Sequence, residues 1–170
     1  MNSSSPHTRL AARGAFAGAA LFVALIVTFS TIGAGQPSAI ILLLLGVIGA
    51  ASHLVLLPVV AELPAPAWAR AGGYAWVAID TMLNVASING GEPKLLASLR
   101  LGGHVPAAVW IGLAAAQAGG GVRVLGLLLA ALLLVHAFVS PWVPAWVIFI
   151  PFVLVPVWLT AVGRRLLRTA

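Results

Sequence analysis

Charged residues are scarce in this chain. Asp, Glu, Lys and Arg make up only 7% of the 170 residues, whereas soluble domains contain roughly 25%. Hydrophobic residues make up 62%, and the mean hydropathy is +1.12. This composition excludes a soluble globular domain. Apolar runs of about 20 residues predict an all-α, polytopic integral membrane protein whose first partner is the lipid bilayer.

Acidic residues are the scarcest charged group, because the chain contains only Glu62, Asp80 and Glu92. Intramembrane aspartyl proteolysis needs two aspartates, and metal-assisted phosphoryl transfer needs clustered carboxylates, so both are excluded. Ser52 precedes His53, but neighbouring residues of a helix point about 100° apart, which argues against a nucleophile and base pair. We therefore expect that the protein is not an enzyme.

Cysteine is absent, which excludes disulfides, thiolate metal sites and thiol chemistry. The formal net charge of +6 is spread over single basic residues at the ends of apolar runs, so they are topology signals and no nucleic acid partner is expected. A small basic cluster at Arg164, Arg165 and Arg168 is suited to anionic lipid headgroups.

The apolar runs predict one domain, 14–163, between a polar N-terminal tail, 1–13, and a basic C-terminal tail, 164–170. Gly14 and Gly18 in its first helix form a pair of small residues that permits close helix approach. About six membrane spans are expected: 14–32, 39–61, 71–89, 101–118, 122–139 and 143–162.

Basic residues are distributed unevenly across these six spans. Lys94 and Arg100 lie on one side, and the segment from Lys94 to Arg100 is expected to be a short amphipathic surface segment before the fourth span. The positive-inside rule therefore places both termini in the cytoplasm, in the inner or plasma membrane of a cell. The opposite side carries seven arginines: Arg9, Arg13, Arg70, Arg123, Arg164, Arg165 and Arg168.

The third span, 71–89, carries polar residues at helical spacing. Gly73, Trp76, Asp80, Asn84 and Ser87 fall on one side of a helix at about 100° per residue. An ionisable group at membrane depth costs several kcal/mol or more, so it faces the bundle interior or a wet cavity. The third helix is therefore expected to be central, with the other helices around it.

Three histidines lie within the predicted spans. At about 1.5 Å per residue, His104 and His136 each lie about 5 Å inside the outer boundary, at a depth comparable to Asn84 and Ser87. His53 is expected about 13 Å from His136 along the membrane normal, and hence apart from this group. If their helices are adjacent, His104 and His136 could share a metal ion or haem; hydrogen bonding near an interface is the commoner role.

These observations predict a small polar cavity lined by Asp80, Asn84 and Ser87 that opens outward toward His104 and His136. The preferred function is binding or transport of a small polar solute, cation or proton, with Asp80 as the charged contact. Such a transporter is expected alone or as a homo-oligomer. The alternative is a non-catalytic membrane subunit or assembly factor, with a different membrane subunit as partner. Haem or metal binding is a minor alternative, and no cofactor is expected otherwise.

Overall fold

The computed structural model describes residues 5–32 and 37–169, and every regular element in them is helical. The membrane helices enclose the core, whose largest fully buried side chains include Trp110 and Trp158. The elements are α1 (Pro6–Ile32), α2 (Ala39–Leu54), α3 (Leu57–Glu62), α4 (Ala67–Ile88), α5 (Pro93–Gln117), α6 (Gly120–Val139), the 3-10 helix η1 (Ser140–Trp142) and α7 (Ala145–Thr169).

The expected membrane class is confirmed. Five helical stretches of the described residues are long and apolar enough to cross a bilayer, with α2 and α3 counted as one stretch. The helix α4 is more polar, but its 22 residues span about 33 Å at ~1.5 Å per residue, which also matches the hydrocarbon core. The protein is therefore a multi-pass helical membrane protein. The five stretches are Pro6–Ile32, Ala39–Glu62, Pro93–Gln117, Gly120–Val139 and Phe149–Thr169.

The contacts between the six long helices form a closed ring. Each of these helices packs against two others in the order α1, α2, α4, α5, α6, α7 and back to α1. The expectation that the third span is central is therefore wrong: α4 lies between α2 and α5, and Met82 on its outer side is 70% exposed. The inward side of a ring shelters polar residues as well as a central position would.

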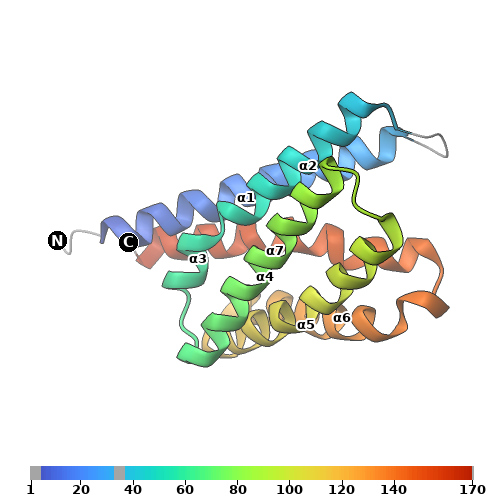
Figure 1. Ribbon diagram of the computed structural model, residues 1–170. Helices are drawn as coiled ribbons and strands as arrows, with labels where there is room; N and C mark the ends of the chain where they lie inside the picture. The colour runs from blue at the N-terminus through green and yellow to red at the C-terminus, as the bar shows by residue number, and fades with distance from the viewer. Residues whose placement is uncertain (1–4, 33–36, 170) are drawn as a thin grey trace.

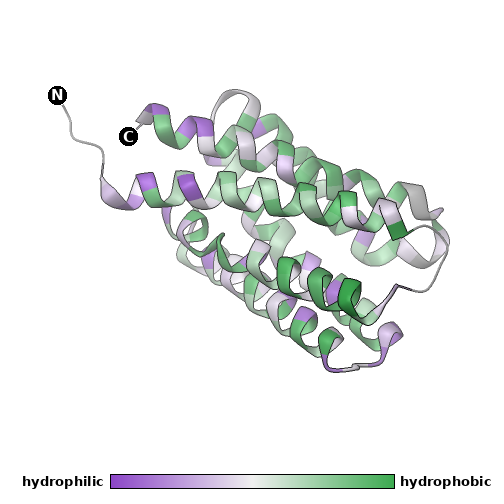
Figure 2. Ribbon diagram, turned by 90° about the horizontal axis from the view of Figure 1, so that it is seen from above, coloured by the Kyte–Doolittle hydropathy of each residue, from purple (hydrophilic) through white to green (hydrophobic). Residues whose placement is uncertain are grey.

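Both termini lie at the same end of the bundle (Figure 1). At this end the Thr8 hydroxyl donates a hydrogen bond to Glu62 Oε1 at 2.5 Å, which joins α1 to α3. Arg165 Nη1 donates to the Gly119 carbonyl at 3.4 Å, which joins α7 to the link before α6. Figure 2 shows hydrophilic residues on the first turns of α1 and the last turns of α7.

We expect this end to face the cytoplasm, because most of the arginines lie at helix ends on this side. In spheroplasts, a single cysteine at Thr169 should react with an impermeant thiol reagent only after permeabilisation. A single cysteine at Asn89, at the opposite end of α4, should react without it. The natural chain is a clean background because it contains no cysteine. The reverse labelling pattern would contradict the orientation.

Helices α1 and α5 each begin about two turns before the predicted spans. The helix α1 begins at Pro6 instead of residue 14, and the Ser5 hydroxyl accepts a hydrogen bond from the His7 N–H at 3.2 Å. The helix α5 begins at Pro93 instead of residue 101, because the Glu92 carboxylate caps its first turn. Residues 94–100 are therefore part of the fourth span's helix and are not a separate surface segment. Hydropathy marks where a helix leaves the hydrocarbon, whereas capping marks where it ends.

The second span is broken at Val55 and Leu56, between α2 and α3. Pro58 has no N–H to donate to the Leu54 carbonyl, and its ring clashes with that carbonyl in a regular helix. The Leu56 N–H instead bonds to the His53 carbonyl at 2.9 Å, which forms a tighter turn. The break therefore begins two residues after His53.

Close packing of α1 against this break depends on glycine. A Cβ atom on Gly14 would lie 2.4 Å from the Val55 carbonyl oxygen, and one on Gly18 would lie 2.7 Å from Leu56 Cδ2. The predicted close approach at these two glycines is confirmed.

Candidate functional site

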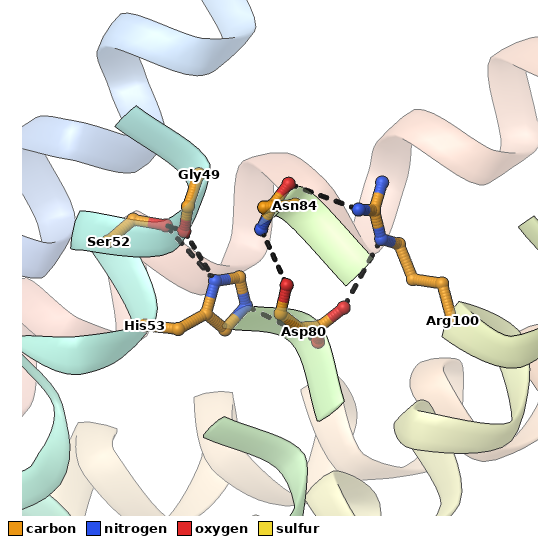
Figure 3. A network of polar contacts seen from close by, with 6 residues as sticks. All are labelled: Gly49, Ser52, His53, Asp80, Asn84 and Arg100. Atoms are coloured by element: carbon orange, nitrogen blue, oxygen red, sulfur yellow. Dashed lines mark hydrogen bonds and ion pairs between the residues drawn. The ribbon is translucent and has the colours of Figure 1, made fainter. Parts of the chain in front are cut away.

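Asp80 is the centre of a buried polar network (Figure 3). The residue is only 2% exposed. One carboxylate oxygen, Oδ2, lies 3.3 Å from His53 Nε2 on α2, and the other, Oδ1, accepts a hydrogen bond from Arg100 Nε on α5 at 3.2 Å. Both oxygens are therefore already engaged by nitrogen atoms from neighbouring helices.

Asn84 fixes the geometry of this network from the next turn of α4. Its Nδ2 donates to the Asp80 carbonyl at 2.8 Å, and its Oδ1 accepts from Arg100 Nη2 at 3.1 Å. Gly49 on α2 leaves room for it, because a Cβ there would lie 2.6–2.9 Å from the Asn84 amide. Arg100 is thus held by two residues of α4 that are one helical turn apart.

The contacts of His53 define how many protons the network holds. His53 Nδ1 lies 2.8 Å from the Gly49 carbonyl, which only accepts hydrogen bonds, so Nδ1 carries a proton. A contact between Nε2 and an oxygen of Asp80 then needs one proton between them. Whichever atom holds it, His53 and Asp80 together carry no net charge, and Arg100 gives the network a net positive charge.

The Ser52 hydroxyl also reaches His53, contrary to the expectation from helix geometry. Its Oγ lies 3.2 Å from His53 Nδ1, because α2 ends here and both side chains bend toward the Gly49 carbonyl. Ser52 is nevertheless fully buried and donates its proton to that carbonyl at 2.7 Å. This hydroxyl is a packing element of α2 and has no access to a substrate.

His104 and His136 are neighbours across α5 and α6. Their ring centroids are 5.2 Å apart and the planes are inclined by 34°. His104 Nδ1 and both ring nitrogens of His136 are buried without a hydrogen-bond partner among the described residues. Among the residues that the structure describes, no group of three or more His, Asp or Glu side chains is placed to hold a metal ion. The pair therefore offers unused polar atoms but no complete metal site.

A cavity of about 540 Å³ lies inside the ring and extends to the link between α4 and α5. Its lining differs between the two sides of the bundle. Helices α1, α2 and α7 contribute mainly apolar side chains, among them Phe22, Phe29, Leu42, Leu45 and Phe152. Helices α4, α5 and α6 contribute the polar residues Asp80, Asn84, Ser87, Arg100, His104 and His136, and His53 of α2 completes this set.

All five residues expected at the site line this cavity: Asp80, Asn84, Ser87, His104 and His136. Ser87 is exposed and lies toward the end of α4.

Sequence reasoning missed Arg100 and His53. Hydropathy puts Arg100 in a surface segment, whereas its side chain extends from α5 into the ring. Counting membrane depth along a straight helix puts His53 apart from the predicted site residues. In the structure its ring contacts Asp80. The buried carboxylate does require a cationic or N–H partner, but this requirement does not show which residue supplies it.

Three tryptophans continue from the cavity toward the termini. Trp76 borders the cavity and contacts the His53 ring edge-on at a centroid distance of 5.2 Å. The ring centroid of Trp110 lies 6.1 Å from that of Trp76, and the ring centroid of Trp158 lies 5.8 Å from that of Trp110. This tryptophan array fills the interior on the terminal side of the cavity.

Comparison with protein-family models, with curated proteins and with solved structures finds no match to this chain.

Proposed function

We propose that the protein binds a small organic solute in the cavity inside its helix ring. The supporting observation is the division of the cavity into an apolar side and a polar side. Ligand sites typically measure about 300–1,000 Å³ and combine a mainly apolar lining with a few placed polar groups. A volume of about 540 Å³ lies within this range.

The polar network is suited to an organic solute better than to a free cation. A cation site needs oxygen ligands with available lone pairs, but both oxygens of Asp80 already contact His53 and Arg100. The buried unpaired atoms on the polar side are ring nitrogens of His104 and His136, and Arg100 keeps N–H groups beyond the two that bond Asp80 and Asn84. Asp80 therefore positions the donors of the site, and it is not the direct contact for a cation.

Transport of the solute is the second part of the proposal. The cavity extends toward one end of the ring, and the tryptophan array lies between it and the other end. Carrying a solute across the membrane then requires a rearrangement of these indoles. We assign no chemical step to the site.

Mass spectrometry of the protein released from native membrane nanodiscs tests this proposal. Ala97 lines the cavity and is exposed, so Ala97→Trp should fill the entrance without disturbing the core. Ala116 on the same helix is exposed but does not line the cavity, which makes Ala116→Trp the matched control. We expect a bound molecule of discrete mass in the natural protein and in Ala116→Trp, and at least about tenfold less of it in Ala97→Trp.

A natural protein that carries no small molecule, or equal occupancy in all three forms, would contradict solute binding at this site. A different polypeptide retained in equimolar amount without a small molecule would instead support a non-catalytic membrane subunit.

A further inference from the structure

The polar side of the cavity carries an excess positive charge. With a proton on Nδ1 toward the Gly49 carbonyl and one more between Nε2 and Asp80, His53 and Asp80 are neutral as a pair. Arg100 adds a full positive charge, and its side chain is 34% exposed. No other carboxylate lines the cavity among the described residues. A ligand that neutralises this side would have to bring a negative charge.

Hydrogen-bond donors remain unused at the same place. A guanidinium has five N–H groups, and Arg100 uses one on Asp80 and one on Asn84. His104 and His136 add ring nitrogens that are buried without a partner. A buried polar atom without a hydrogen bond costs about 1–3 kcal/mol. A guanidinium only donates, and each neutral imidazole can donate from one ring nitrogen, so a ligand that accepts hydrogen bonds can use all three residues.

The opposite side of the cavity is apolar. Phe22, Phe29 and Phe152 from α1 and α7 form edge-on ring contacts with centroid distances of 6.2 and 6.5 Å, and Leu42 and Leu45 of α2 continue this surface. Such a surface suits a hydrocarbon chain or ring, because burial of each CH₂ group contributes about 0.8 kcal/mol.

We propose that the solute is an amphipathic anion, with its acidic group on Arg100, His104 and His136 and its apolar part against the three phenylalanines. This inference rests on the proposed solute-binding function and names the chemical class of the solute. The anionic head could be the carboxylate of a free fatty acid or the phosphate of a lipid headgroup, since both accept hydrogen bonds from arginine and histidine.

Binding of dansyl-labelled undecanoic acid to the protein in phosphatidylcholine nanodiscs tests the inference. Trp76 borders the cavity, so energy transfer from tryptophan to the dansyl group should report occupancy. Unlabelled undecanoic acid should displace the probe at least about tenfold better than undecanol or undecylamine. In His136→Gln the Kd for the probe should rise at least about tenfold, whereas His7→Gln, an exposed histidine at the start of α1, should leave it unchanged.

The two sources of the anion are separated by adding phosphatidylglycerol to the nanodiscs. Displacement by phosphatidylglycerol identifies a lipid headgroup, and displacement by undecanoic acid alone identifies a free carboxylate; either result supports the amphipathic anion. Equal displacement by the acid, the alcohol and the amine would overturn the anion while leaving solute binding intact, provided that Ala97→Trp abolishes the signal. Probe binding that Ala97→Trp and His136→Gln leave unchanged would overturn both proposals.

Discussion

Asp80→Asn is expected to lower the free energy of unfolding by about 3 kcal/mol, because it leaves Arg100 without the carboxylate that it contacts in this buried network. The carboxylate is almost fully buried and contacts both His53 and Arg100. The expected loss of stability lies at the lower end of the range of about 3–5 kcal/mol for a broken buried ion pair. The reason is that Arg100 is partly exposed and retains contact with water. Reversible unfolding in mixed detergent micelles measures this change.

The double variant Asp80→Asn, Arg100→Gln separates charge compensation from simple loss of contacts. If the two charges stabilise each other, the double variant should lose clearly less free energy of unfolding than the sum of the two single variants. Glu92→Gln is the matched control, because that carboxylate is exposed and caps the first turn of α5; its cost should be at most about 1 kcal/mol. Additive single effects would contradict the coupling.

Gly14→Val is expected to have the second large effect, a loss of about 3 kcal/mol or a failure to assemble. Its Cβ would lie 2.4 Å from the Val55 carbonyl oxygen, and a backbone atom cannot turn away as a side chain can. The helix α1 would have to separate from the break between α2 and α3. The midpoint of thermal unfolding in detergent measures the loss.

Gly102→Ala is the control for this substitution. Gly102 lies inside α5, and a Cβ added to it would meet no other atom within 4 Å, so alanine should be neutral or should stabilise the helix by up to about 1 kcal/mol. An unchanged unfolding midpoint in Gly14→Val would show that the contact between α1 and Val55 is not tightly packed.

The sequence is sufficient to predict the class of the fold and the buried side of α4. Of the predicted side, Gly73, Trp76, Asp80 and Asn84 are buried, because the cost of exposing a carboxylate to lipid is large and local to one helix. Ser87, near the end of the helix, is exposed. Which helices would contact that side was not predictable. Contacts between helices depend on their tilt and rotation, which are set by packing against neighbours.

Arg100 and His53 illustrate this limit. Arg100 lies at the hydropathy boundary of its span, where a long side chain can extend either toward water or into the bundle. His53 is followed by a break in its helix, so counting residues along a straight axis misplaces it. In both cases the side-chain direction is decided by the partner on α4, and that partner is unknown before the helices are assembled.

The ring arrangement of the helices has a geometric consequence. Six helices packed about 8–10 Å apart around a closed circuit leave an axial space about as wide as one more helix. Side chains decide where this space is filled. Trp76, Trp110 and Trp158 form a floor nearer the termini, and a cavity of about 540 Å³ lies on the other side of them. The interior therefore has the form of a cup that extends toward the link between α4 and α5.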